Sequence, residues 1–249
     1  MTPDRSGLYR RRDGKEALWF SASDIETMME DVLQKAGTFP TEAQPAVNIE
    51  RLIERIGVHL DQHASLDAAV LGLTEFHSDR PPKILINRDL TGAIDDDNTP
   101  PGIRGRWRAT LAHEASHVVM HRVLFDVNPD QETLFRTEEQ PESQRLMRCL
   151  KKDVLFRSGG ANDWREVQAN MGMAALLMPQ SLFRRLAARV EEARHLSAEA
   201  LSSGSAAAAT LSAEMAALFD VSKQAAGIRL QTLRILSSAG QPWLVQGVQ

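Results

Sequence analysis

The sequence predicts an α+β fold, in which a small sheet packs on several helices. Apolar residues recur at helical spacing in about seven segments along the chain. Two short apolar runs, 70–76 and 83–87, have the length and composition of strands. At 249 residues, the chain is long enough for one large domain or for a core domain with a smaller appendage. Few strands and many helices together indicate the α+β class.

The first hundred residues are predicted to contain two helices and two strands. Ser23, Asp24 and Glu26 resemble a capping box at the start of the first helix. Gly57 is expected as the C-cap of the second helix. The expected elements are a charged arm at 1–20, a helix from 23 that ends at Gly37, a helix at 48–56, strands at 70–76 and 83–87, and a loop at 91–105.

The rest of the chain is predicted to be mainly helical. Pro179 ends one of the helices, because the residue before a proline disfavours helical geometry. The expected elements are helices at 105–124, 163–178, 181–195, 211–219 and 222–236, a charged connection at 126–162 with one helix near 142–152, and an Ala/Ser-rich stretch at 202–210 that is either a flexible joint or the start of a helix.

Composition narrows the class of partner. The formal charge is −4, so nothing favours a nucleic-acid backbone or an anionic membrane as the main partner. Cys149 is the only cysteine, which excludes an intramolecular disulfide and favours a reducing compartment. The first residues are polar, and no window approaches 18 consecutive apolar residues. We therefore expect a cytoplasmic protein with no membrane partner.

The strongest chemical signal is an HExxH motif, His113-Glu114-Ala115-Ser116-His117. Side chains four residues apart share a face of a helix, so both imidazoles can reach one Zn²⁺ ion. Glu114 lies about 100° around the helix, where it can touch a metal-bound water without being a ligand. Zinc lowers the pKa of such a water from ~15.7 towards ~7, and the carboxylate can take its proton as the water attacks a carbonyl.

A chance match to the motif is the alternative interpretation. Trp107, Leu111 and Val118 form an apolar stripe, which indicates that the motif lies on a genuine, half-buried helix. Two imidazoles near such a stripe need a polar partner, and a metal ion supplies one. We therefore prefer the metal site.

A catalytic zinc ion needs a third protein ligand. The extended pattern HExxHxxGxxH fails, because Met120 and Val123 stand where its glycine and last histidine would be. The remaining candidates are His121, Cys149 and a downstream carboxylate. His121 lies one turn beyond His117 and cannot easily converge on the same ion, so we expect it behind a ligand or at the surface. A lone cysteine is usually a small buried hydrophobe.

Glu166 is the best candidate for the third ligand. It begins a segment that is apolar on one side and polar at Glu166 and Asn170, which are four residues apart and share a helix face. The run Asp163-Trp-Arg-Glu166 also fits a capping box, in which the glutamate only caps the helix. Spacing alone leaves both interpretations open.

Three stretches of the sequence resemble the ImmA/IrrE family of metallo-endopeptidases. They are Leu111–His117 around the motif, Asp163–Asn170 with its Glu and its Ala-Asn pair, and Ala174–Pro179, which ends in Leu-Met-Pro. Residues 84–87 look like the family's strand before the motif helix, and 218–230 look like its C-terminal helices. The similarity spans about residues 45–235.

The resemblance implies a zincin-like peptidase domain in which His113, His117 and Glu166 bind zinc and Glu114 is the general base. It divides the chain into an N-terminal arm and helix at 1–44, a catalytic domain at 45–196 and a helical C-terminal segment at 197–249. Members of the family cleave helix-turn-helix transcription repressors, so a protein of that kind is the expected substrate. The family usually has Gly where Ser116 stands and a bulky apolar residue at Ala115, but neither position is a ligand.

Other functions are weighed against the peptidase. Residues 211–236 fit a DNA-binding helix-turn-helix, although its second helix offers only Lys223, Gln224 and Arg229 for contacts. The protein could also be a zinc-containing regulator that binds a repressor without cutting it, or a hydrolase of small amides. For a peptidase, we expect the substrate to add to the strand at 83–87.

The arginines before the motif are a weaker signal. Arg104, Arg106 and Arg108 lie near the start of the motif helix, where the helix dipole disfavours cations. They could grip an acidic partner, but a solvated face is the preferred interpretation.

Overall fold

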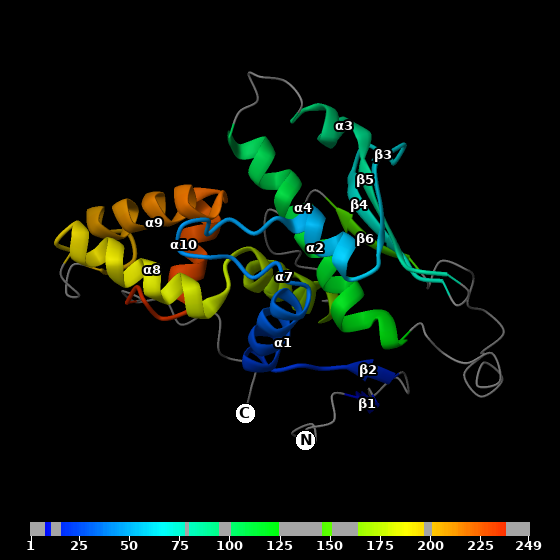
Figure 1. Cartoon of the computed structure of the whole chain (residues 1–249), viewed down its shortest axis with the longest axis horizontal. Helices are drawn as coiled ribbons and strands as arrows, with labels where there is room; N and C mark the ends of the chain where they lie inside the picture. Colours follow the sequence, from blue (N-terminus) through cyan, green and yellow to red (C-terminus); the bar gives the residue numbers. More distant parts are fainter. Residues whose placement is uncertain are drawn as a thin grey trace.

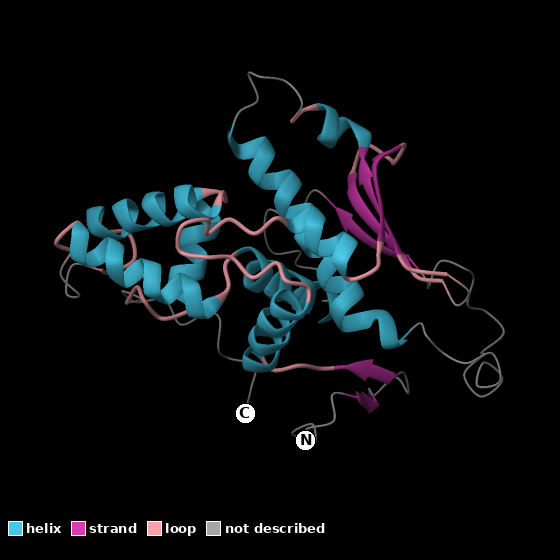
Figure 2. Ribbon diagram, viewed as in Figure 1, coloured by secondary structure: helices cyan, strands magenta, loops and turns pink. Residues whose placement is uncertain are grey.

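The computed structural model describes residues 8–10, 16–77, 80–94, 101–124, 146–150, 164–196 and 201–237. Within these residues the chain is an α+β protein, as the sequence predicts. The main sheet lies at one side of the molecule, and most helices lie on the other side of the long helix that carries the motif (Figures 1 and 2). No helix in this part of the chain has the length and apolar character that crossing a membrane requires.

The helices largely follow the predicted order. They are α1 (Ala22–Lys35), α2 (Ile49–Arg55), α3 (Arg88–Gly92), α4 (Pro101–His121), α7 (Trp164–Leu177), α8 (Gln180–Ala193), α9 (Ala206–Phe219) and α10 (Lys223–Thr232), with a short 3-10 helix, η1 (Arg122–Leu124), after α4. The Ala/Ser-rich stretch is the start of α9 rather than a joint. The predicted bounds of the loop at 91–105 are partly wrong, because α3 extends to Gly92 and α4 already begins at Pro101.

The N-cap of the first helix lies two residues earlier than predicted. Ser21, not Ser23, is the N-cap: its hydroxyl accepts from the backbone N–H of Asp24, whose carboxylate accepts from the N–H of Ser21. Glu26 is therefore free of a capping role and pairs with Arg229 instead. The C-cap of the second helix lies one residue before the predicted one: Ile56, not Gly57, is the C-cap of α2. Gly57 follows it with φ +73°, a conformation in which a Cβ would be strained.

The strands form two sheets. They are β1 (Leu8–Arg10), β2 (Glu16–Leu18), β3 (His59–Ala64), β4 (Val70–Glu75), β5 (Lys83–Asn87) and β6 (Leu146–Leu150). β1 and β2 pair with each other within the expected arm, and the main sheet has the order β3-β5-β4-β6. β3 is parallel to β5, whereas β4 is antiparallel to both β5 and β6.

This topology confirms two predicted strands and corrects two other expectations. β4 and β5 match the predicted strands at 70–76 and 83–87. The helix expected near 142–152 is wrong, because 146–150 is a strand that pairs with β4 from a distant part of the chain. The expectation that a substrate adds to 83–87 is also wrong. β5 lies between β3 and β4, so both of its edges are already hydrogen-bonded.

The motif helix lies at the centre of the molecule. α4 contacts β4, β5 and β6 on one side and α7 on the other, and α1 packs against α7 (Figure 1). Leu111, Ala112 and Ala115 on α4 are fully buried. Because the middle of α4 is covered on both faces, a polar residue buried there must find its partners inside the protein.

Candidate metal centre

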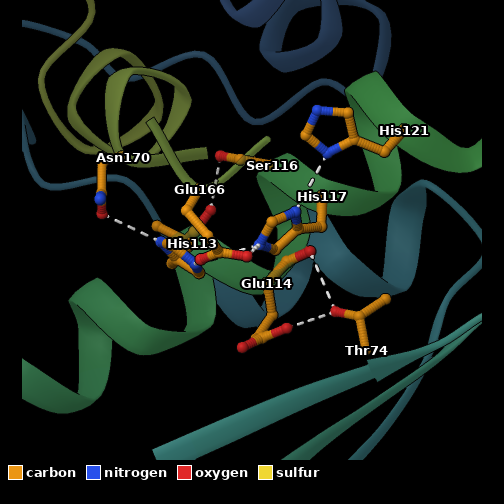
Figure 3. A network of polar contacts seen from close by, with 9 residues as sticks. Thr74, His113, Glu114, Ser116, His117, His121, Glu166 and Asn170 are labelled. Carbon is orange, nitrogen blue, oxygen red and sulfur yellow. Dashed lines mark hydrogen bonds and ion pairs between the residues drawn. The ribbon is translucent and has the colours of Figure 1, made fainter. Parts of the chain in front are cut away.

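The HExxH motif lies in the buried middle of α4. His113, Glu114 and His117 are all 0% exposed, so the expectation of a half-buried helix underestimates how deep the motif lies. The two imidazoles point toward α7, and the Glu114 side chain points toward the sheet (Figure 3). The i, i+4 spacing of the histidines has the predicted result, since their Nε2 atoms lie 3.1 Å apart.

Glu166 in the first turn of α7 completes a group of three metal-ligand side chains. Its Oε2 lies 3.2 Å from His113 Nε2, and its Oε1 lies 3.4 Å from His117 Nε2 (Figure 3). The ligand atoms of the three residues all lie within 4.8 Å of one another, so together they could hold one metal ion. Two ligand atoms bound tetrahedrally to one zinc ion lie about 3.3 Å apart, close to the spacing found here.

The hydrogen bonding of His113 indicates that the side chains of His113, His117 and Glu166 together could bind a cation. His113 Nδ1 lies 3.1 Å from Asn170 Oδ1. That oxygen can only accept, so Nδ1 carries the hydrogen and a neutral His113 has its lone pair on Nε2. This lone pair faces a carboxylate oxygen and a second imidazole nitrogen. Electron-pair donors that converge in a buried site need a positive charge between them, which a divalent metal ion would provide.

The pKa values follow from the same crowding. Burial acts to lower the pKa of His113, but the hydrogen bond with Glu166 and the charges of Glu114 and Glu166 outweigh it, and the pKa is raised. The pKa of His117 is lowered, by burial and by the charge of His113. Burial raises the pKa of Glu166, yet its hydrogen bonds with both histidines hold that pKa far below the ordinary value. The site therefore keeps Glu166 ionised and disfavours a second charged imidazole.

Glu114 is held by β4. The Thr74 hydroxyl donates to Glu114 Oε2 at 2.5 Å (Figure 3). Gly72, two residues earlier on the same face of the strand, leaves the room that this carboxylate occupies: a Cβ there would lie 2.9 Å from Glu114 Oε1 and 2.8 Å from Thr110 Cγ2. The sheet thus fixes a carboxylate beside the three-residue group without adding it to that group.

Small residues let the two site helices approach each other. A Cβ on Gly172 of α7 would lie 2.8 Å from Ser116 Oγ and 2.9 Å from Ser116 Cβ on α4. The Ser116 hydroxyl donates to Ala112 O at 2.7 Å, so its hydrogen bond is made within its own helix. The close contact brings Glu166, near the start of α7, within reach of the motif.

The other sequence candidates have different positions. His121 is fully buried and lies behind His117, with Nδ1–Nδ1 at 3.0 Å, which matches the expectation of a residue behind a ligand. Cys149 lies on β6, where its backbone pairs with Gly72. Most of the connection at 126–162 lies outside the described residues.

The preferred interpretation of the arginines as a solvated face is wrong for Arg108. It is buried, and it donates from Nε to Asp220 O and from Nη2 to Val47 O. Arg104 also pairs with Asp220, at 3.0 Å. These arginines hold the C-terminal helices against α4.

Sequence reasoning missed two residues that touch the site. Thr74 gave no signal, because a threonine in a strand is common and its partner is forty residues away. Gln168 lies two residues from Glu166, and nothing in the sequence links it to His121, although its Oε1 lies 3.1 Å from His121 Nε2. The sequence indicates Asn170 through the helix face that it shares with Glu166 and through the Ala-Asn pair of the family resemblance, but it does not indicate the contact with His113.

The comparisons with known proteins add no further constraint. No protein-family model matches the chain, and no curated protein matches it.

Proposed function

We propose that this protein is a zinc-dependent endopeptidase with a zincin-like fold, in which His113, His117 and Glu166 hold the metal and Glu114 is the general base. The observation that carries the proposal is the convergence of three ligand side chains within 4.8 Å, two of them fully buried and Glu166 partly buried, with a fixed carboxylate next to them. Three protein ligands are the usual number in catalytic zinc sites, which keep one position open for water.

Each side chain has a separate part in the proposed reaction. A zinc ion bound here would lower the pKa of its water and polarise the substrate carbonyl. Asn170 orients His113 through the hydrogen bond to Nδ1. Glu114 takes the proton from the attacking water and passes it to the leaving amine. Thr74 holds the Glu114 carboxylate at Oε2, so the base stays in one orientation as the proton moves.

The proposed substrate is a helix-turn-helix transcription repressor, which would be cleaved to relieve repression. This substrate class is supported by the resemblance to the ImmA/IrrE family. A peptide can add to β3 or β6, the edge strands of the main sheet among the described residues. β6 is the better choice, since it neighbours β4, the strand that bears Thr74.

The test compares two substitutions that separate metal binding from chemistry. We expect Glu114→Gln to retain zinc and lose cleavage, and His113→Ala to lose both. Zinc is measured by inductively coupled plasma mass spectrometry, and cleavage by mixing the zinc-loaded protein with the repressor encoded by a neighbouring gene and analysing fragments by mass spectrometry. Full cleavage by Glu114→Gln would remove Glu114 from the role of base.

The alternative function is a zinc-containing regulator that binds a repressor or DNA without proteolysis. α9 and α10 do form two helices joined by a three-residue turn. Against DNA binding, Arg229 is 2% exposed and engaged with Glu26 and Met178, and Asp220 in the turn pairs with Arg104. A regulator of this kind would keep its biological output in the Glu114→Gln variant, whereas an endopeptidase would lose it.

A further inference from the structure

A chain of hydrogen bonds runs from His117 into the interior. His117 Nδ1 lies 3.0 Å from His121 Nδ1, and His121 Nε2 lies 3.1 Å from Gln168 Oε1. All three side chains are 0% exposed, so bulk water does not reach these contacts. We refer to these three residues as the imidazole chain. Figure 3 shows its first contact, with His121 on the side of His117 that faces away from Glu166.

The direction of these bonds is fixed from the Gln168 end. The Gln168 Oε1 atom can only accept, so His121 Nε2 must carry a hydrogen. A neutral imidazole has one N–H, which makes His121 Nδ1 an acceptor. His117 Nδ1 must then donate to it. A neutral His117 is left with its lone pair on Nε2, the atom that faces Glu166 and His113.

We infer that His121 and Gln168 are positioning residues that hold His117 as the Nδ1–H tautomer, with Nε2 ready to bind a metal ion. The inference rests on the metal site of the proposed function and adds how the chain prepares that site. With the amide of Gln168 reversed, every bond would run the other way, and His117 would direct an N–H at the metal position. The orientation of one buried amide therefore decides whether His117 can be a ligand.

Both histidine ligands are prepared by the same helix. Asn170 accepts directly from His113 Nδ1, whereas Gln168 acts on His117 through His121. Glu166, Gln168 and Asn170 all lie within the first two turns of α7. This helix thus provides a third ligand and both of the groups that orient the ligands of α4. Such outer hydrogen bonds typically change metal affinity by about 10- to 100-fold when they are lost.

The test reads the tautomers directly in the full-length protein. Long-range ¹H–¹⁵N spectra of ¹⁵N-histidine-labelled protein identify which ring nitrogen carries the hydrogen, before and after zinc is added. Zinc affinity is measured by competition with a chromophoric chelator. Gln168→Met removes the acceptor, and Gln168→Glu keeps one. Gln62→Met is the control for the same substitution, because Gln62 lies on β3 and donates to Glu50 of α2 in an exposed contact that involves no residue of the site.

In the wild type, we expect hydrogen on His121 Nε2 and His117 Nδ1, in both the zinc-free and the zinc-loaded protein. Gln168→Met should lose this single pattern and bind zinc about 10- to 100-fold more weakly, while Gln168→Glu and Gln62→Met stay within a few-fold of the wild type. Hydrogen on His121 Nδ1 in the wild type, or unchanged zinc affinity in Gln168→Met, would overturn the inference. If Gln168→Met does not fold, the wild-type spectrum alone decides.

The two proposals fail separately. A wild type that shows the expected tautomers but binds no zinc rejects the metalloenzyme and leaves the imidazole chain intact. A wild type that binds zinc with the opposite tautomers rejects the role of His121 and Gln168 alone.

Discussion

Thr74 and Glu114 join the main sheet to the motif helix at the position where the proposed base lies. The Thr74 hydroxyl contacts both the carboxylate of Glu114, at 2.5 Å, and its backbone oxygen, at 3.4 Å. Both residues are 0% exposed, so the short contact to the carboxylate is a hydrogen bond to a charged group out of water. The sheet therefore fixes the orientation of the Glu114 side chain. Without this contact, the side chain could adopt several rotamers on the helix.

Thr74→Val should impair catalysis without removing the metal. Hydrogen bonds to charged groups contribute about 1.5–3 kcal/mol, so we expect kcat for a cleaved peptide to fall by about tenfold or more, with zinc content and KM nearly unchanged. Thr74→Ser retains the hydroxyl and should retain most of the activity. Equal kcat values for the Val and wild-type proteins would show that Glu114 does not need this contact.

Gly172→Ala should push α7 away from α4. The added methyl meets Ser116, so we expect a loss of about 1–3 kcal/mol in the free energy of unfolding and weaker zinc binding. Gly102→Ala is the control on α4, where a Cβ would meet nothing within 4 Å. Adding Ser116→Gly to Gly172→Ala removes the clashing side chain and should restore zinc affinity. Stability is measured by urea unfolding, and a harmless Gly172→Ala would contradict the packing argument.

The stability of the zinc-free protein should fall with acid because of His121. Burial, helped by the charge of His117, lowers the pKa of His121 to about 3. The pKa of a histidine in the unfolded chain is ~6.5. At pH values between the two pKa values, His121 is therefore protonated in the unfolded chain and neutral in the folded protein. Stability is therefore lost as the pH falls through this window, by up to about 1.4 kcal/mol per pH unit.

The contribution of His121 to the pH dependence of stability is measured by comparing the wild type with a variant that lacks this imidazole. His113 has a raised pKa and acts in the opposite direction, so its contribution is lost as the pH rises. The comparison is between wild type and His121→Asn in urea unfolding at several pH values, with zinc removed by a chelator. We expect the variant to show the shallower fall toward acid. Identical slopes would mean that His121 accepts a proton in the folded protein.

The C-terminal helices should depend on a buried ion pair between α10 and α1. Arg229 is 2% exposed and binds both carboxylate oxygens of Glu26 as well as the carbonyl of Met178. Glu26→Gln leaves Arg229 with an uncompensated charge, and removing one partner of such a pair costs about 3–5 kcal/mol. Lys223→Ala on the exposed side of α10 should change the free energy of unfolding by less than about 0.5 kcal/mol. Comparable effects of the two substitutions would contradict the ion pair's role.

The sequence predicted those parts of the site that depend on local spacing. His113 and His117 are neighbours because residues four apart share a helix face, and a helix containing Glu166 and Asn170 was visible from its apolar pattern. Glu166 itself was ambiguous from spacing, since a capping role fits the same letters. In the structure, the packing of α7 on α4 brings Glu166 to the two histidines. Sequence spacing within a single helix does not predict such packing between helices.

The parts that could not be predicted depend on long-range contacts. Residues 146–150 become a strand only because β4 offers an edge, and Thr74 meets Glu114 only because β4 lies under α4. Gln168 and Arg108 likewise find their partners on other elements of the fold. Propensity reports what a segment prefers alone, and tertiary pairing decides these positions.

The central claim is that one metal ion binds between His113, His117 and Glu166, and crystals of the zinc-loaded protein test it most directly. Anomalous diffraction measured at the zinc absorption edge should show one peak, about 2.0–2.2 Å from both Nε2 atoms and a Glu166 oxygen. No peak at this position, or a zinc ion held by other residues, would contradict the account.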